Sequence, residues 1–174
     1  MMKLGEYAPR FLRRLVTELY GRPTNFSWID DDRVAGSGYP FTLKSIQWLK
    51  ERGITFLLSL TEDSPSRSFL QTVGINHEHI PMINRMPERP EVLDKAVDII
   101  AGEIKKGGKV AVHCLAGQGR TGMVLACYLV REKGLPAQKA IEYVKKERPG
   151  SLARAKQRDA VMKYQEYIQK KTIG

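Results

Sequence analysis

Hydrophobic residues along the chain form two alternating patterns, short apolar runs and amphipathic stretches with helical spacing. The apolar run at residues 54–60 is continuous, which is typical of a strand buried on both faces of a sheet. Strands are predicted at residues 26–29, 33–35, 54–60, 75–80 and 109–113. Helices are predicted at residues 8–20, 42–52, 64–73, 91–106, 119–133, 136–148 and 151–171. Because strands alternate with helices, we expect an α/β fold, with a central, mostly parallel sheet of about four to five strands flanked by helices on both faces.

The first predicted helix, at residues 8–20, separates apolar from basic side chains. Its apolar face carries Phe11, Leu12, Leu15, Val16, Leu19 and Tyr20. The arginines that lie largely off this face are Arg10, Arg13 and Arg14. A helix of this kind binds a membrane surface or packs on its own domain, and we favour packing. Since Gly21-Arg22-Pro23 ends it, the sequence divides into an N-terminal amphipathic helix at residues 1–22 and a larger domain at residues 23–174.

Composition agrees with a single globular domain. With 174 residues, of which 42% are hydrophobic, the chain can bury a core without disulfides or a metal. No apolar run approaches the length of a membrane span, and the first ten residues lack the apolar segment of a signal peptide. We therefore expect a cytoplasmic location.

The chain is basic, with a net charge of +10 from 29 lysines and arginines against 19 acidic residues. This charge favours anionic substrates or anionic surfaces. The basic residues are scattered and are not interleaved with aromatic residues in one stripe. Nucleic acid is therefore not expected as a partner.

The two cysteines lie in different surroundings. Two are too few for a disulfide framework, so each needs its own explanation. Cys127 lies in an apolar helical stretch and is expected to be a small buried side chain. Cys114 follows an apolar strand and precedes a turn with Gly117 and Gly119, after which a helix begins. The position of Cys114 indicates a reactive role instead of a packing role.

The turn that follows Cys114 has the features of an anion-binding loop. Successive backbone N–H groups in a glycine-containing turn can converge on one point. The following helix adds its unpaired N–H groups and the positive end of its dipole. A phosphate group suits such a turn, and the residues expected to bind it are Leu115, Ala116, Gly117, Gln118, Gly119 and Arg120.

Four side chains in and beside this loop are candidates for catalysis. The thiol of Cys114, near N–H donors and an arginine, is expected to have a lowered pKa and to act as a thiolate nucleophile. Arg120 carries a planar fork of donors that matches phosphate oxygens. Thr121 can donate its hydroxyl to the sulfur when the thiolate leaves, and His113 can hold the loop by a hydrogen bond to the backbone.

Residues 113–121 resemble the signature H-C-x-x-G-x-x-R-S/T of the protein tyrosine phosphatase superfamily, and every fixed position is filled. The chain also resembles the small dual-specificity phosphatases of that superfamily at residues 23–28, 33–36, 59–62, 79–81, 126–130 and 148–151. The resemblance implies the cysteine-phosphatase fold, a phosphatase catalytic domain at residues 23–174, no metal and no other cofactor. It also implies hydrolysis of phosphotyrosine, with some activity toward phosphoserine and phosphothreonine, through a phosphocysteine intermediate at Cys114. A phosphorylated protein or peptide is then the expected partner, and phosphate-like oxyanions are expected inhibitors.

The sequence departs from this family at the general acid. The family takes its proton donor from an aspartate about thirty residues before the nucleophile, and an ungapped count back from Cys114 places Asn84 there. An amide cannot donate a proton as an acid does. Three interpretations are open: Glu88 or Glu91 supplies the proton, or turnover is slow and substrate is held longer, or the substrates have good leaving groups.

Residues of three further types outside the loop are candidates for a functional role. Gln157 matches a family glutamine that positions the hydrolytic water, with an exposed helix glutamine as an equal alternative. His77 and His79 alternate on a strand, but no cysteine or further histidine lies near them, so a metal site is not expected. Asp63 follows a strand and is either a turn residue or a side chain that faces the site.

Two other functions compete with a protein phosphatase. The net charge suggests a phosphoinositide or another small phosphomonoester as substrate, although Leu115 and Gln118 occupy positions where lipid phosphatases of the superfamily tend to carry lysine. Asn84 suggests a slow phosphate-binding pseudo-enzyme, although binding alone does not need the thiolate of Cys114. A membrane surface is compatible with the first helix but is not favoured as a partner.

Overall fold

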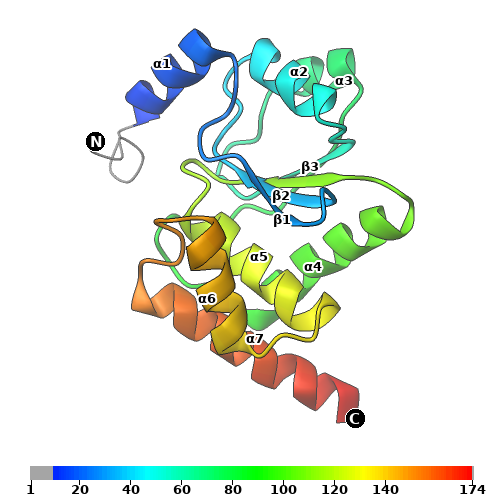
Figure 1. Ribbon diagram of the computed structural model, residues 1–174, viewed down its shortest axis with the longest axis vertical. Coiled ribbons are helices and arrows are strands. Elements are labelled where there is room, and N and C mark those ends of the chain that lie inside the picture. The colour runs from blue at the N-terminus through cyan, green and yellow to red at the C-terminus, as the bar shows by residue number, and fades with distance from the viewer. Residues whose placement is uncertain (1–9, 174) are drawn as a thin grey trace.

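The chain folds around a five-stranded sheet, and the computed structural model describes residues 10–173 (Figure 1). The strands are β1 (Ser27–Asp30), β2 (Val34–Ser37), β3 (Phe56–Ser59), β4 (Asn76–His79) and β5 (Val110–His113). The helices are α1 (Arg10–Tyr20), α2 (Leu43–Glu51), α3 (Arg67–Val73), α4 (Pro90–Lys105), α5 (Gly119–Glu132), α6 (Ala137–Glu147) and α7 (Ala155–Ile173).

The strand order in the sheet is β1-β2-β5-β3-β4, with β1 antiparallel to β2 and all other neighbours parallel. The predicted α/β fold, with a mostly parallel sheet and helices on both faces, is confirmed. Because β5 is central, the carboxyl ends of β2 and β3 flank its own end, and Ser37 and Ser59 are level with His113. Side chains and loops from three strands therefore meet at one edge of the sheet.

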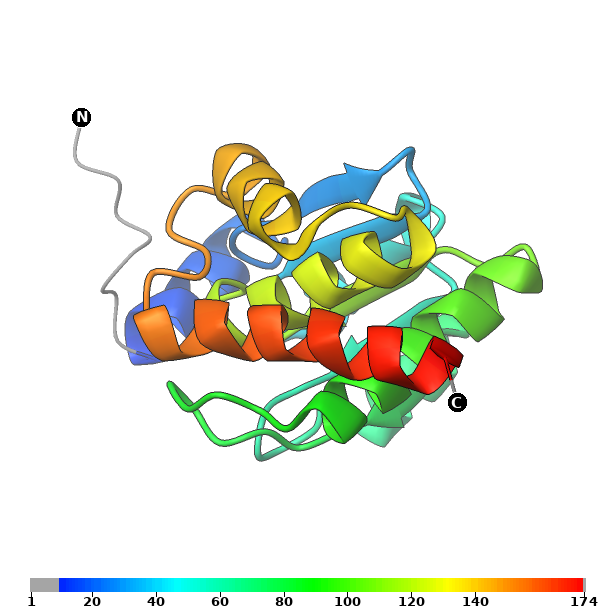
Figure 2. The ribbon, with the colours of Figure 1, turned by 90° about the horizontal axis from the view of Figure 1, so that it is seen from below.

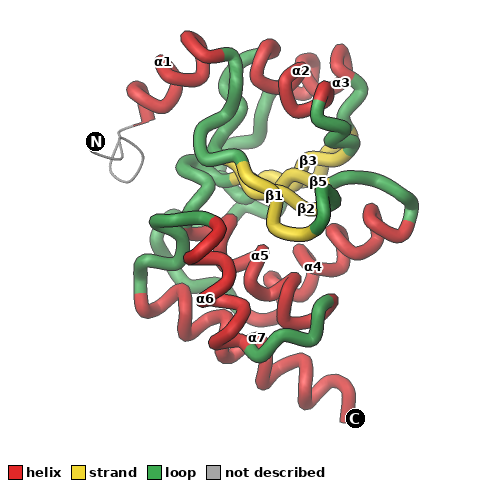
Figure 3. Tube along the Cα trace, viewed as in Figure 1, coloured by secondary structure: helices red, strands yellow, loops and turns green. Residues whose placement is uncertain are grey.

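Two apolar layers hold the sheet between its helices. Figures 1 and 3 show α1, α2 and α3 on one side of the sheet and α4, α5, α6 and α7 on the other. Side chains of β5 alternate between these layers, with Val110 and Val112 in the larger core and Ala111 in the smaller one. Helix α5 contacts α4, α6 and α7 and is buried at residues 120–130, so the helix that follows the Cys114 loop is firmly anchored.

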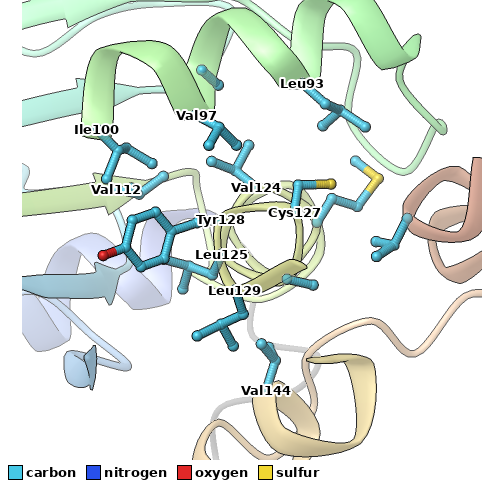
Figure 4. Packing of buried hydrophobic residues seen from close by; sticks show 14 of the residues in the cluster. Leu93, Val97, Ile100, Val112, Val124, Leu125, Cys127, Tyr128, Leu129 and Val144 are labelled. Atoms are coloured by element: carbon cyan, nitrogen blue, oxygen red, sulfur yellow. The ribbon is translucent and has the colours of Figure 1, made fainter. Parts of the chain in front are cut away.

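Cys127 lies in the larger core, as its apolar neighbours predict. Figure 4 shows it on α5 among side chains that include Leu93, Val97 and Val124. Its thiol is fully buried, and burial raises the pKa well above the usual value. This cysteine therefore contributes packing and not reactivity.

Helix α1 packs on the domain with only part of its predicted apolar face, because Leu12 and Val16 are half-buried and border a cavity that Trp48 also lines. Residues 8 and 9 of the predicted helix lie outside the described residues. The buried residues of α1 are Arg13 and Thr17, whereas Phe11 and Leu19 are 71% and 69% exposed. Arg13 borders the cavity that contains Cys114, where burial lowers the pKa of its guanidinium and the charge of Cys114 acts in the opposite direction.

Two helices begin later than predicted. Helix α3 starts at Arg67 because Pro65 disfavours helical backbone at the residue before it, and Ser66 Oγ caps the helix by accepting from Phe69 N at 3.5 Å. Helix α7 starts at residue 155 because residues 151–154 form a turn, in which Leu152 has a left-handed φ of 52°. Within residues 10–173, no helix has the length and apolar character needed to cross a membrane.

Candidate active site

Cys114 lies directly after β5, at the carboxyl end of the central strand. Residues 114–118 form the loop between β5 and α5, and all of them except Gly117 border an open cavity of about 660 Å³. The predicted site residues that this cavity brings together are Asn84, Cys114, Leu115, Ala116, Gln118, Gly119, Arg120 and Gln157.

Each carbonyl group of this loop accepts a hydrogen bond from a residue outside the loop. The carbonyls of residues 114 to 118 accept, in chain order, from His113 Nδ1 (3.4 Å), Tyr39 N (3.2 Å), Asn25 Nδ2 (2.7 Å), Arg148 Nη2 (2.6 Å) and Gly122 N (2.9 Å). In a trans peptide the N–H group points away from the C=O group. The N–H groups of residues 115–119 therefore turn away from these donors, as a cradle for an anion requires.

Gly117 is the tightest point of the loop. Its φ is +71°, in the left-handed region, and a Cβ there would lie 2.5 Å from the carbonyl carbon and oxygen of Ser37. Both of these atoms belong to the backbone of β2, so neither can move aside without disturbing the sheet. The loop passes over the end of β2 because residue 117 is glycine.

The Cys114 thiol is buried, yet its pKa is lowered. Burial raises the pKa and is the largest single effect on this thiol. The Thr121 hydroxyl, the charge of Arg120 and the N–H groups of Thr121 and Gln118 together outweigh it. The Thr121 hydroxyl is buried and bonds no other group of the described residues, so it is available to the sulfur. Cys114 is therefore more acidic than an ordinary thiol, which favours the thiolate form that a nucleophile needs.

Arg120 is held at the cavity by acceptors from the ends of two strands. Its Nη1 donates to Glu62 Oε2 at 2.8 Å, to Met82 O at 2.9 Å and to Leu60 O at 3.3 Å. All these bonds use one nitrogen, so Nε and Nη2 are available to an oxyanion. The hydrogen bond from Arg120 lowers the pKa of Glu62, which stays ionised. Glu62 Oε1 also accepts from Asn84 N at 3.2 Å and so links the arginine to the loop before α4.

His113 lies behind the loop as a neutral link in a chain of hydrogen bonds. It is fully buried, and burial lowers its pKa to about 3. Its Nδ1 lies 3.4 Å from Cys114 O, and because a carbonyl only accepts, we assign the proton to Nδ1. Its Nε2 then accepts from Ser59 Oγ at 2.5 Å, and Ser59 Oγ accepts from His77 Nε2 at 2.8 Å. The chain fixes the orientation of the imidazole against the loop.

Replacing His113 by asparagine should make stability less sensitive to acid. An imidazole in the unfolded chain binds a proton below about pH 6.5, whereas His113 in the folded chain stays neutral down to about pH 3. The unfolded state binds more protons across this window, so the free energy of unfolding falls as the pH is lowered through it. Between about pH 6.5 and about pH 4.5, this fall should be about 2 kcal/mol smaller in His113→Asn, measured by urea unfolding. An equal reduction in His79→Asn, whose side chain is less buried, would argue against this assignment.

Arg148 holds the loop from its far side; it belongs to a stretch that resembles the family, at residues 148–151, but the sequence did not indicate this role. Its guanidinium is buried and donates to Asn25 O at 2.8 Å, Gly36 O at 2.9 Å and Gly117 O at 2.6 Å. Burial lowers the pKa of Arg148 to about 10, and the Cys114 thiolate acts in the opposite direction, so the side chain is charged at neutral pH. All its partners among the described residues are neutral, which makes a nearby anion favourable.

Gln157 reaches the cavity from α7. It is 3% exposed, and a Cβ on Gly119 would lie 2.6 Å from its Nε2 and 3.1 Å from its Oε1. The structure thus places it against the loop and not on an exposed helix face. An amide in this position can orient a water molecule above the loop.

The structure brings no carboxyl group to the general-acid position. Asn84 borders the cavity, but Glu88 and Glu91 do not. Glu88 Oε1 accepts from Arg89 N at 2.8 Å, and Glu91 is exposed in the first turn of α4. Two carboxylates lie beside the cavity, and both are ion-paired: Glu62 with Arg120 at 2.8 Å and Asp63 with Arg10 at 3.7 Å.

Four arginines around the cavity were missed by sequence reasoning. They are Arg10, Arg13, Arg85 and Arg154. Arg85 and Arg154 lie within three residues of Asn84 and Gln157, and this closeness in sequence could have indicated them. The two on α1 gave no such signal. Asp63 lies at the edge, with Oδ2 3.7 Å from Arg10 Nη1.

The two strand histidines are engaged in hydrogen bonds. His77 Nε2 bonds Ser59 Oγ, and His79 Nε2 donates to Thr61 O at 2.6 Å. In the part of the chain that the structure describes, no group of three or more potential ligands is placed to hold a metal ion.

A buried thiolate at the end of a central parallel strand, facing N–H groups and an arginine, defines the class of cysteine-dependent phosphatases. Residues 23–161 match the family model "PTP-SAK: Swiss Army Knife protein, DSP-PTPase phosphatase domain", and the chain belongs to this family. The resemblance to dual-specificity phosphatases is thereby confirmed. Helix α1 lies outside the matched residues.

Curated relatives share only part of their length with this chain. It is 28% identical over 150 residues to the tyrosine-protein phosphatase cdc-14 of Caenorhabditis elegans, covering 78% of this chain and 21% of that protein. It is 31% identical over 149 residues to the phosphatidylglycerophosphate phosphatase PTPMT1 of Arabidopsis thaliana, covering 81% of this chain and 43% of that protein. The chain thus spans less than half the length of either relative.

Solved structures share the fold over nearly their whole length. Tk-PTP in its active form is 26% identical, with a TM-score of 0.75, and the match covers 82% of this chain and 97% of that chain. Human DUSP28 is 21% identical, with a TM-score of 0.72, and the match covers 84% of this chain and 97% of that chain.

Proposed function

We propose that this chain hydrolyses phosphate monoesters through a phosphocysteine intermediate at Cys114, with phosphotyrosine as the preferred protein substrate. The observation that carries the proposal is the loop whose carbonyls are all bound from outside, with a low-pKa thiolate and Arg120 beside its N–H groups. A phosphorylated protein or peptide is the partner, phosphate-like oxyanions are inhibitors, and the location is cytoplasmic.

In the first step, Cys114 Sγ attacks phosphorus and the bond between phosphorus and the leaving oxygen breaks. The N–H groups of residues 115–119 and the guanidinium of Arg120 stabilise the equatorial oxygens. The leaving oxygen takes its proton from water, because the carboxylates beside the cavity, Glu62 and Asp63, are ion-paired with Arg120 and Arg10.

In the second step, a water molecule held by Gln157 attacks phosphorus and the bond from phosphorus to sulfur breaks. Both protons of the water leave with the product as dihydrogen phosphate. The electron pair returns to Cys114, where the Thr121 hydroxyl stabilises the thiolate.

The lack of an acid in the cavity favours aryl over alkyl phosphates. A phenol has a pKa of about 10, so phenolate leaves with less help than the alkoxide of serine or threonine. We therefore expect phosphotyrosine to react faster than phosphoserine or phosphothreonine, which agrees with a preference for substrates with good leaving groups.

A series of substituted phenyl phosphates tests this proposal. The logarithm of kcat/KM should fall steeply as the pKa of the leaving phenol rises, because no proton donor compensates for a poorer leaving group. A burst of one product molecule per Cys114 without further turnover would instead support the slow phosphate-binding protein. A value of kcat/KM that does not depend on the leaving group would contradict the proposal that no general acid takes part.

A second candidate substrate is a phospholipid or inositol phosphomonoester. The arginines around the cavity favour a highly charged headgroup, and the relative in Arabidopsis thaliana is named a phosphatidylglycerophosphate phosphatase. Comparing kcat/KM for a phosphotyrosine peptide and for a water-soluble lipid phosphomonoester separates the two candidates.

A further inference from the structure

Exposed apolar side chains gather beside the Cys114 cavity. In residues 10–173, most of the large apolar side chains that are exposed lie on α1 or in the loop at residues 81–89, and they are Phe11, Leu15, Leu19, Tyr20, Ile83 and Met86. Both segments also border the cavity, through Arg10 and Arg13 of α1 and Asn84 and Arg85 of the loop. Figure 2 shows α1 and the loop before α4 at the same end of the molecule.

The apolar residues of α1 form a continuous stripe. Phe11, Leu15 and Leu19 are spaced four residues apart, so they lie on one face and extend over about 12 Å of helix. They are 71%, 44% and 69% exposed. The opposite side, with Arg13 and Thr17, faces the domain. Single exposed apolar residues are common, but a contiguous apolar face marks an interaction surface.

The charge around the stripe is basic. Arg10 and Arg14 are paired with Asp63 and Glu18, at 3.7 Å and 2.7 Å. Arg22, which lies beside α1, and Arg85 and Arg154, which border the cavity, are exposed and form no ion pair with the described residues. Apolar side chains surrounded by unpaired cations suit an anionic lipid surface, which offers acyl chains and phosphate groups together.

We infer that α1 and the loop at residues 81–89 bind the surface of an anionic phospholipid bilayer, with the apolar stripe in the interface and the Cys114 cavity facing the headgroups. A second copy of the chain is a poorer occupant, because two basic ends would repel each other. A phosphopeptide is also a poorer occupant, since its phosphate would enter the cavity without covering a stripe that runs along α1.

Sedimentation with lipid vesicles tests this inference. The full chain should bind vesicles of phosphatidylcholine with phosphatidylglycerol, should bind vesicles of phosphatidylcholine alone much less, and should lose binding at high salt. The double variant Leu15→Gln with Leu19→Gln should bind these vesicles with an affinity at least about tenfold lower. Met162→Gln is the matched control, because it removes an exposed apolar side chain from α7. It should bind as the wild type does.

The inference does not depend on the proposed enzymatic activity, because the readout is binding. Turnover of soluble p-nitrophenyl phosphate by the double variant should equal that of the wild type, which would show that its site is intact. Unchanged vesicle binding by the double variant would overturn the inference. A dimer in light scattering that the double variant loses, without vesicle binding by the wild type, would assign the stripe to a second copy.

Discussion

Replacing Arg120 by lysine is expected to lower kcat/KM for aryl phosphates by about 10³-fold or more. Lysine keeps the positive charge and can still form an ion pair with Glu62, so the structure after β3 is preserved. It loses the planar fork, in which Nη1 is occupied by Glu62, Leu60 and Met82 while the other nitrogens serve the oxyanion. A single ammonium group cannot fill both positions, so the transition state loses a bidentate partner.

Steady-state kinetics with p-nitrophenyl phosphate measure this loss, and inhibition by vanadate should weaken in parallel. Arg89→Lys is the matched control, because Arg89 is exposed and lies outside the cavity. The unfolding midpoint of Arg120→Lys checks that the variant is folded. Wild-type activity in this variant would refute the role given to Arg120.

Changing Asn84 to aspartate is expected to raise kcat/KM for phosphoserine peptides by about 10²-fold or more at acidic pH. The two side chains are nearly equal in size, and Asn84 borders the cavity with its backbone N–H held by Glu62. The new carboxyl group would therefore lie where the leaving oxygen departs. Because arginines surround it, its charged form is favoured, so the gain should fade as the pH rises and the carboxyl group loses its proton.

A pH profile of kcat/KM checks this expectation. The variant should gain a basic limb that the wild type lacks, and its dependence on the leaving group should flatten. Asn84→Leu is the control, since it alters the same position without supplying a proton. No gain at any pH at which the variant stays folded would show that residue 84 is not the general-acid position.

The parts of the molecule that the sequence predicted well are encoded locally. The apolar run at residues 54–60 is long enough to indicate a buried strand, and it contains β3. The loop residues from Cys114 to Arg120 are contiguous, so their residue types alone indicate an anion-binding turn between a strand and a helix. The opposite roles of the two cysteines likewise follow from their immediate neighbours.

The parts that were missed depend on contacts between distant segments. Glu62 and Arg120 are 58 residues apart, and Arg148 and Gly117 are 31 residues apart. The spacing of residues in the sequence predicts neither contact. The burial of Arg13 and Thr17 on α1 was not predicted, because periodicity reveals which residues share a face and not what that face meets. The side of α1 that meets the domain carries Arg13 and Thr17.

The hydrogen bonds to the loop carbonyls make the reactivity of Cys114 depend on the completed fold. The donors come from residues 25, 39, 113, 122 and 148, and Arg148 also bonds Asn25, 123 residues away. A nascent chain still on the ribosome lacks this scaffold, so its cysteine has an ordinary thiol pKa of about 8.5. The sulfur becomes reactive, and open to peroxide, once synthesis and folding are complete. Oxidative damage should therefore spare unfinished chains and fall on mature molecules.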